Sequence, residues 1–238
     1  MTGAVGKIIG ITRYPVKSFA GESLQSCEID TYGLFGDRFC AFYDETKQGW
    51  DSFFTARDLP VMLSYQAQLI EDEVRITSPD GRVFRWDQQL LEEIQCYTTQ
   101  KLSMKSYKSP NPEAPELMSV DLASVLIITD AALNRLEEIW GKRLDPRRFR
   151  ANLIVSVDEA ALQENEWIGK RLAMGTAQLE VNQYCERCSM ITLDPDTLER
   201  DTTLLRKVRE VMGVNFGLYA SVKQTGCIQV GDNVYIMD

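Results

Sequence analysis

The sequence predicts a β-rich α+β fold, in which a β-barrel architecture carries a few helices. Short runs of β-branched and aromatic residues recur along the whole chain, whereas amphipathic helical patterns are few. Many short strands joined by glycine turns are typical of barrels. Glycines recur through the first fifty residues and so favour short strands over helices, among them Gly21, Gly33, Gly36 and Gly49.

The first half of the chain shows two strand patterns and one clear hairpin. Residues 6–16 (GKIIGITRYPV) and 61–70 (VMLSYQAQLI) are β-branched and aromatic with partial alternation. Residues 71–86 (EDEVRITSPDGRVFRW) hold two alternating runs joined by a Ser-Pro-Asp-Gly turn at 78–81. We therefore expect an N-terminal β-barrel module made of short strands.

A proline-rich segment is the best candidate for a domain boundary. Residues 109–116 (SPNPEAPE) contain three of the eight prolines in a short polar run, which can neither pair continuously nor coil. We predict an N-terminal module over residues 1–108, a connecting loop at 109–116 and a second domain over 117–238.

The second half mixes strands with two amphipathic helices. Val125–Ile128 is predicted as a buried strand, and Thr129 as the N-cap of a helix starting at residue 130. A second helix is expected over 201–213, ending at a glycine. Further strands are predicted at 149–157 and 178–184, with a closing hairpin over 226–238 that turns at Gly231-Asp232.

Composition and charge exclude several classes of function. The 238 residues are 44% hydrophobic and 26% charged, which is enough apolar content for a real core. The net charge of −9 argues against nucleic-acid and anionic-membrane binding. A basic-then-apolar N-terminus and an apolar run of membrane-spanning length are both missing, so a cytoplasmic protein that binds no membrane is the default expectation.

The chain contains no histidine, and this narrows the possible chemistry. Ser/His and Cys/His nucleophilic catalysis, the commonest metal ligand and the usual neutral-pH general base are all removed. Six cysteines are scattered along the chain and are expected to be mostly reduced thiols. Any chemistry must therefore use cysteine, carboxylates, arginine, lysine or a cofactor.

The segment VNQYCERCSMITLDPDT, residues 181–197, contains Cys185 and Cys188 around Glu186-Arg187. A structural zinc site needs four ligands, and neither a second cysteine pair nor a histidine is present. A thioredoxin-like pair stands at a helix N-terminus, but a strand and turn are expected after Cys188. An activated thiolate remains, because the adjacent arginine favours deprotonation. Such a thiolate can act as a nucleophile or as a soft metal ligand.

Cations in this acidic chain recur beside small, hydroxylated or turn residues. Each one alone is most simply explained as a surface charge paired with a carboxylate, yet some adjoin apolar strand residues. Guanidinium groups combined with hydroxyls and turn amides can form a phosphate site. Neither a Walker loop nor a GxGxxG motif is present. The cations are Lys17, Arg38, Arg57, Arg147, Arg148 and Arg150, and their small or polar neighbours are Ser18, Gly36, Thr55 and Asn152.

Taken together, these motifs resemble the MOSC family. YPVKS, GESL, GLFGDRF and FTARDLP are similar to the N-terminal β-barrel module of MOSC proteins. DPRRFRANLIV, YCERCSMITLDPDT and NFGLYASVKQTGCIQVGDNVYIM are similar to the MOSC domain itself, which amidoxime reducing components share with the C-terminal part of molybdenum cofactor sulfurase. Two positions depart from the family pattern: Cys40 stands where tryptophan is common and could reshape the pocket wall, and Ala151 stands where proline is common.

The resemblance implies a site for the molybdenum cofactor, Mo-molybdopterin. It implies that Cys188 is the catalytic thiolate ligand of the metal and that Cys185 is a packing thiol. It further implies that a set of mostly basic and polar residues contacts the pterin or its terminal phosphate. These expected cofactor-binding residues are Lys17, Ser18, Arg38, Arg57, Thr129, Arg150, Asn152 and Arg187.

The function implied is reduction of N-hydroxylated compounds such as amidoximes, hydroxylamines and N-hydroxylated bases. Electrons would come from a separate donor protein of flavin, ferredoxin or cytochrome type, because the chain has no flavin or iron–sulfur motif. Protons would come from water, Asp194 or Asp196. Two alternatives stay open: a non-catalytic carrier of the cofactor, and a sulfur-transfer protein with a persulfide on Cys188.

Overall fold

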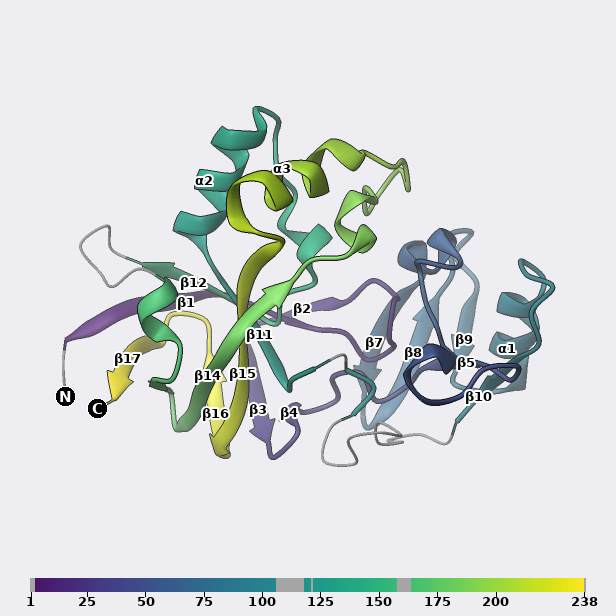
Figure 1. The fold of residues 1–238 in the computed structure, drawn as a ribbon. Helices are drawn as coiled ribbons and strands as arrows, with labels where there is room; N and C mark the ends of the chain where they lie inside the picture. Colours follow the sequence, from purple (N-terminus) through teal and green to yellow (C-terminus); the bar gives the residue numbers. More distant parts are fainter. Residues whose placement is uncertain (1–2, 106–117, 121, 158–163, 238) are drawn as a thin grey trace.

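The computed structural model describes residues 3–105, 118–120, 122–157 and 164–237. Its centre is a closed barrel of seven strands in the order β12-β11-β15-β14-β13-β17-β1, closed by pairing between β1 and β12 (Figure 1). The barrel is antiparallel except for the parallel pair β11–β12. The β-rich, barrel-based prediction is confirmed. The barrel strands are β1 (Ala4–Arg13), β11 (Val125–Thr129), β12 (Leu153–Val157), β13 (Arg171–Met174), β14 (Ala177–Glu186), β15 (Asn215–Gln224) and β17 (Asn233–Met237).

The first strand of the chain completes a barrel that is otherwise built from the C-terminal half. β1 pairs with β12 along one edge and with β17 along the other. Gly6 allows the β12 strand to approach closely, because a Cβ there would lie 2.2 Å from the carbonyl oxygen of Ser156. The two halves are therefore interleaved rather than strung in series.

Side chains alternate between the barrel interior and its outer face. On β11, Val125 and Ile127 belong to the interior cluster, whereas Leu126 and Ile128 belong to a second cluster outside. Trp167 is fully buried in the interior cluster. Alternate residues along a barrel strand therefore face either the barrel interior or its outer face.

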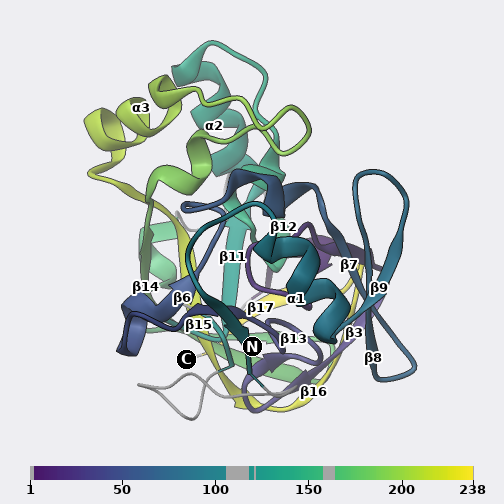
Figure 2. The same cartoon turned by 90° about the vertical axis from the view of Figure 1, so that its right-hand side faces the viewer.

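Two helices cover part of the outer face. α2 (Asp130–Trp140) and α3 (Thr202–Met212) lie side by side over the barrel in both views (Figures 1 and 2). They bury Leu136 and Leu204, and the Trp140 indole donates to the Thr203 hydroxyl at 2.9 Å. Thr129 caps α2 by accepting from the amide of Ala132. Both predicted helices and the predicted cap are confirmed.

The N-terminal module forms a separate lobe beside the barrel, at the right of Figure 1. It consists of small three-stranded antiparallel sheets and one short helix around its own apolar cluster. The third small sheet, β16-β3-β4, extends from the barrel. The remaining strands are β2 (Glu22–Leu24), β3 (Ser26–Asp30), β4 (Gly33–Leu34), β5 (Phe42–Asp44), β6 (Phe53–Phe54), β7 (Gln66–Ile70), β8 (Glu73–Thr77), β9 (Val83–Arg85), β10 (Leu102–Met104) and β16 (Gly226–Gln229), and the helix is α1 (Gln88–Gln95).

Most predicted strands occur, with three corrections. The strand expected at 149–157 begins only at Leu153, because a 3₁₀ turn at Pro146–Phe149 and the left-handed Arg150 precede it. The hairpin over 71–86 is confirmed as β8 and β9. The strand expected at 61–70 begins only at Gln66, because Pro60–Ser64 forms a 3₁₀ turn that starts with proline. The expected closing hairpin is wrong: a turn is present at Gly231-Asp232, but β16 pairs with β3 while β17 pairs with β13 and β1. The local pattern marks a turn but does not choose the partners of its arms.

The proposed boundary loop at 109–116 lies outside the described residues, so the domain division stays a prediction. Within the described ranges, none of the helices is long and apolar enough to cross a membrane.

Candidate functional site

A cavity lies where the N-terminal module meets the outer face of the barrel. Residues from both halves of the chain line it, and eight of the nine predicted site residues are among them. Six of its lining residues are cations, so it is strongly basic in an acidic protein. The predicted residues that line it are Lys17, Ser18, Arg38, Arg57, Arg150, Asn152, Arg187 and Cys188.

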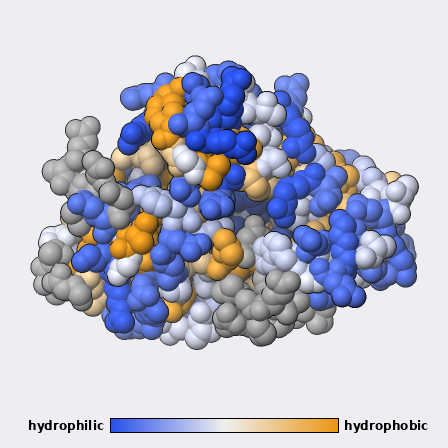
Figure 3. Space-filling view, viewed as in Figure 1, coloured by the Kyte–Doolittle hydropathy of each residue, from blue (hydrophilic) through white to orange (hydrophobic). Residues whose placement is uncertain are grey.

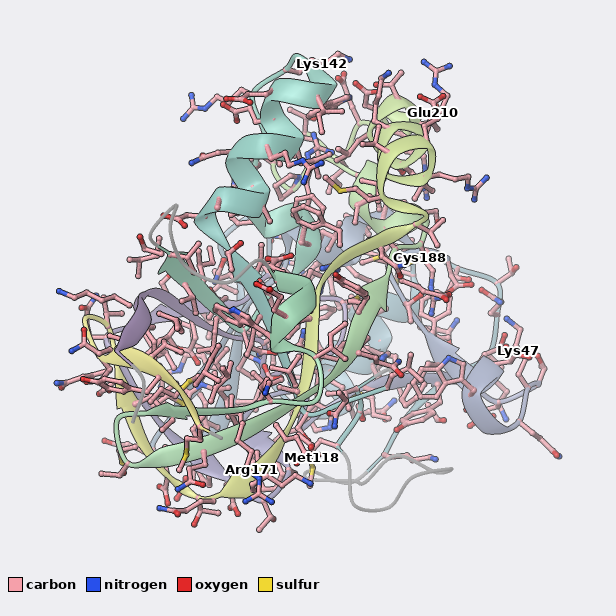
Figure 4. The ribbon with its side chains drawn as sticks, turned by 60° about the vertical axis from the view of Figure 1, so that its left-hand side comes forward. Lys47, Met118, Lys142, Arg171, Cys188 and Glu210 are labelled. Carbon is pink, nitrogen blue, oxygen red and sulfur yellow. The ribbon has the colours of Figure 1, made fainter. Side chains whose placement is uncertain are left out.

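The two cysteines of the CxxC segment have different environments. Cys185 is only 2% exposed and packs in the outer-face cluster, where its thiol donates to the carbonyl of Glu186 at 3.6 Å. Cys188 is exposed and follows the end of β14, as Figure 4 shows. A four-residue 3₁₀ turn, Ser189–Thr192, follows it in place of an α-helix. Cys188 is therefore the accessible thiol of the pair, and a thioredoxin-like arrangement is not formed.

Arg187 is fixed beside that thiol by two backbone carbonyls. Its Nε donates to Phe216 O at 2.7 Å and its Nη1 to Phe149 O at 2.9 Å. Its Nη2 is buried and has no hydrogen-bond partner within the described part of the chain. Gly217 makes room for the guanidinium, because a Cβ at that residue would lie 3.0 Å from Nη2. A buried donor of this kind is the feature expected at an anion site.

Arg38 and Arg150 enter the cavity from opposite halves of the chain. Arg38 forms an ion pair with Asp37, and its Nη2 donates to the carbonyl of Arg150 at 3.2 Å. Arg150 donates from Nη1 to the carbonyl of Phe19 at 2.8 Å. Both guanidinium groups lie over the ring of Tyr14.

Lys17 is a buried cation in the cavity wall, with 7% of the residue exposed. Its Nζ donates to Ser119 O at 3.0 Å and lies 4.5 Å from the centre of the Phe53 ring and 5.3 Å from that of Trp50. Aromatic faces attract an ammonium group, so the ring pair fixes the position of this charge.

Backbone strain is concentrated at this cavity. Seven non-glycine residues of the described chain have left-handed backbones, and three of them, Ser18, Arg38 and Arg150, line the cavity with φ of 70°, 50° and 55°. Each such conformation costs on the order of 1–3 kcal/mol for an L-residue, and strained residues cluster at binding and catalytic sites. The strain independently indicates a functional site.

Arg57 lies at the edge of the cavity and is exposed. Its Nε donates to the hydroxyl of Thr55 at 3.2 Å, and that hydroxyl donates to Asp58 at 3.0 Å. Arg57 also lines a neighbouring hollow formed with Lys47 and Trp50. It is thus shared by two adjoining spaces.

The first two arginines of DPRRFRAN, Arg147 and Arg148, have different roles. Arg147 is a surface residue paired with Asp145 and Asp196, both at 2.6 Å. Arg148 pairs with Asp194 at 2.7 Å and lines the cavity with a buried Nε that lacks a partner among the described residues. Sequence reasoning grouped Arg148 with the cations but did not place it in the site.

Asp194 and Asp196 are not suitable proton donors, which corrects the sequence-based expectation. Backbone amides, Thr197 first, lower the pKa of Asp194, and the ion pair with Arg147 lowers the pKa of Asp196. Neither residue lines the cavity. Both carboxylates anchor arginines.

Thr129 is the predicted site residue that the structure places elsewhere. On β11 it alternates in step with Val125 and Ile127, which face the barrel interior. The cavity lies on the opposite side of the strand, where Leu126 is. Its hydroxyl donates to Glu164 at 2.7 Å while capping α2. Thr129 therefore does not line this cavity, and its expected contact with a cofactor stays a prediction.

Asn152 lines the cavity but also connects two barrel strands. Its Oδ1 accepts from the amide of Leu126 at 3.1 Å, and its Nδ2 donates to the carbonyl of Thr12 at 3.3 Å. Cys40, expected to reshape the pocket wall, is instead buried in the core of the N-terminal module. Burial raises the pKa of the Cys40 thiol well above its ordinary value.

Some lining residues carry no signal in the sequence. Met190 and Tyr219 line the cavity, and although both stand in the quoted motifs, an apolar or aromatic side chain there has no distinguishing chemistry. Among the described residues, no group of three histidine, cysteine, aspartate or glutamate side chains is placed to hold a metal ion. The site is thus an exposed thiol beside a basic cavity.

Comparison with family models matches almost the whole chain. A model described as the MOSC domain matches residues 115–235, and one described as the MOSC N-terminal beta barrel domain matches residues 5–120. The solved YUAD protein of Bacillus subtilis superposes with a TM-score of 0.50 at 15% identity, covering 97% of this chain and 94% of that one. At that identity the likeness shows the fold alone.

Curated relatives include amidoxime reducing components and molybdenum cofactor sulfurases. Mitochondrial amidoxime reducing component 2 of Homo sapiens is 33% identical over 130 residues, which are 49% of this chain and 38% of that protein. The protein of that name from Rattus norvegicus is 26% identical over 98% of this chain and 84% of its own length. Molybdenum cofactor sulfurase of Danio rerio is 34% identical over 44% of this chain and 13% of its length. The matched segment thus spans well under two thirds of the human protein.

Proposed function

The chain belongs to the MOSC family, and from this premise we propose that it is a molybdenum-cofactor-binding oxidoreductase that reduces N-hydroxylated compounds. One observation supports the proposal above all: the exposed thiol of Cys188 and six cations line a single cavity. The relatives named amidoxime reducing components support the reaction class.

The residues present fit a pterin-phosphate that carries a soft metal. Buried nitrogens of Arg148 and Arg187 without partners among the described residues fit an anionic group that would accept from them. An accessible thiol is the ligand type that a soft transition metal selects. Cys188 would hold the metal, while Lys17, Arg38 and Arg150 would hold the phosphate end.

When bound, the cofactor supplies two-electron redox chemistry. In the net reaction of an amidoxime, the N–O bond breaks, two electrons and two protons are taken up, and the corresponding amidine and water are formed. The chain contributes binding and orientation. Of the described cavity-lining residues, Glu186 is the carboxylic acid, so we propose that protons arrive from solvent directly or through this exposed group.

The first test is metal and pterin content in protein purified from a host that makes the cofactor. Wild type is expected to hold near-stoichiometric molybdenum and pterin, and Cys188→Ala to lose the metal while staying folded. Cys185→Ala is the matched control, because its thiol is buried in packing. Equal molybdenum in wild type and Cys188→Ala would refute the assignment of the ligand.

A second measurement separates the enzyme from its alternatives. Loaded wild type with an artificial reductant is expected to reduce benzamidoxime to benzamidine. Bound cofactor without turnover of any N-hydroxylated compound would identify a carrier instead. A cyanide-labile sulfur on Cys188, without molybdenum, would identify a sulfur-transfer protein.

We propose that electrons come from a separate protein of flavin, ferredoxin or cytochrome type. The chain carries a net charge of −9, and the face in Figure 3 is largely hydrophilic with apolar residues in separate patches. Such a surface suits electrostatic docking to a basic patch on the donor. The reduction rate with a competent donor should then fall as salt is raised, whereas a salt-independent rate would contradict this mode of docking.

A further inference from the structure

Tyr14 lies directly behind the two arginines that span the cavity. It follows β1, is 4% exposed, and is held through its backbone. Its amide donates to Asp37 Oδ1 at 2.8 Å, and its carbonyl accepts from the amide of Arg38 at 2.7 Å. Its ring packs against Gly21, where an added Cβ would lie 2.5 Å from the ring. The ring is therefore fixed in place.

The same ring contacts both guanidinium groups. The Cζ atom of Arg38 lies 4.5 Å from the ring centre and that of Arg150 lies 4.3 Å from it. The two cations repel each other, and the negative face of an aromatic ring offsets part of that repulsion. Asp37 balances Arg38 through an ion pair, and the ring adds stabilisation beside two charges that come from different halves of the chain.

Tyr14 interacts with these cations as a neutral ring. Burial raises the pKa of its phenol above the ordinary value, although Arg150 and Arg38 lower it. The hydroxyl therefore keeps its proton at neutral pH, and the attraction depends on the π-face. Phenylalanine has the same face, which makes the ring and the hydroxyl experimentally separable.

We propose that Tyr14 is a positioning residue that holds Arg38 and Arg150 together as one preformed clamp for a phosphate group. Two fixed guanidinium groups side by side match the charge of a phosphate dianion. Because the side chains are placed before the ligand arrives, little ordering cost remains at binding. The inference rests on the proposed function in taking the cavity as a phosphate site, but it does not require molybdenum.

The test measures the affinity of the full, cofactor-free chain for inorganic phosphate by calorimetry at low salt. Tyr14→Phe is expected to bind within about twofold of wild type, and Tyr14→Leu about tenfold more weakly, as expected when cation–π contacts are lost. Phe84→Leu is the control, because that ring lies under Arg82 at 5.3 Å and does not line the cavity. Its phosphate affinity should be unchanged.

A double-mutant cycle distinguishes positioning from a purely structural role. Arg150→Gln should weaken phosphate binding, and adding Tyr14→Leu to it should cost much less than Tyr14→Leu does in wild type. Fully additive losses would show that Tyr14 does not act through Arg150. If Tyr14→Leu fails to fold, phenylalanine with successive ring fluorines at position 14 keeps the shape and weakens the π-face, so phosphate affinity should fall with each fluorine.

Several results would overturn the inference. These are no measurable phosphate binding by wild type, equal losses in the phenylalanine and leucine variants, or affinity independent of fluorination. The proposed function fails separately. If the chain never retains molybdenum but its phosphate affinity falls with ring fluorination, the proposed enzyme is refuted and the phosphate clamp is supported. If the chain retains molybdenum but its phosphate affinity does not depend on the ring at position 14, the clamp is refuted and the proposed function stands.

Discussion

The Nη2 atom of Arg38 donates a hydrogen bond to the carbonyl oxygen of Arg150 at 3.2 Å, and this bond joins the two halves of the chain across the cavity. Arg150 in turn donates a hydrogen bond to the carbonyl of Phe19, which belongs to the N-terminal half. Each arginine is thus positioned by backbone that belongs to the other half. The basic cavity forms only when the N-terminal module is docked on the barrel, so folding and site assembly are coupled.

Substitutions at Ser18 should change phosphate affinity and the free energy of unfolding in different directions. Its φ of 70° is unfavourable for serine and ordinary for glycine. We expect Ser18→Gly to keep or raise the free energy of unfolding, by up to about 1 kcal/mol, because relief of strain outweighs the added chain entropy. Phosphate affinity should nevertheless fall if the hydroxyl contacts the ligand. Ser18→Ala, which keeps the strain, is the control in calorimetry and urea unfolding.

Gly217 is expected to tolerate no side chain. A Cβ there would lie 2.8 Å from Ile128 Cγ1 and 3.0 Å from Arg187 Nη2, on a backbone with φ of 81°. Gly217→Ala should lower the free energy of unfolding by more than about 2 kcal/mol and weaken phosphate binding through displacement of Arg187. Urea unfolding and calorimetry measure the two effects.

The control for this prediction is Gly141→Ala. Gly141 has a similar φ of 72°, but an added Cβ would meet nothing within 4 Å. It should therefore show the cost of the left-handed backbone alone, with phosphate binding unchanged. Equal losses of stability at the two positions would show that the contacts around Gly217 relax without penalty.

Local patterns predicted much of the secondary structure because those patterns are local in origin. The cap at Thr129, the helix end at Gly213 and the turn at 78–81 depend on residues within a few positions of one another. The pairing of β1 with β12 and β17, and the separation of β16 from β17, join residues that are far apart in the chain. Alternation shows that a strand has a buried face but does not identify its neighbour.

The site was predictable where its chemistry lies in short motifs. Residue type and family resemblance together predict Cys188, Lys17 and Arg38, and all three line the cavity. Thr129 does not line the cavity, because one residue of register along β11 separates the barrel interior from the cavity side. The sequence around Tyr14 does not indicate a role in the site, because an aromatic residue before proline is typical of an ordinary core. The two arginines over its ring are apparent only in the structure.

Asn152 should contribute substantially to the free energy of unfolding, because its side chain pairs with two backbone groups. Asn152→Ala leaves the buried amide of Leu126 and the carbonyl of Thr12 without their side-chain partners. Each unsatisfied group costs about 1–3 kcal/mol, so we expect the free energy of unfolding to fall by about 2–4 kcal/mol in urea titrations.

Asn182→Ala is the matched control for Asn152, because its amide donates to Ser221 Oγ on the surface. Its effect should stay within about 0.5 kcal/mol. A small effect at position 152 as well would mean that water replaces the lost hydrogen bonds, and the two strands would then not depend on this side chain.

Glu164 should make stability depend on pH in the direction opposite to a paired carboxylate. It accepts from the hydroxyl of Thr129 at 2.7 Å, yet burial raises its pKa above the ordinary value of 4.5. The native state then holds its proton more tightly than the unfolded state, so the free energy of unfolding falls as pH rises from about 4.5 through the native pKa. Glu164→Gln should remove this fall and be more stable than wild type at pH 7. Urea unfolding between pH 4 and 8 tests this, with exposed Glu138→Gln as control; parallel pH profiles for wild type and Glu164→Gln would contradict it.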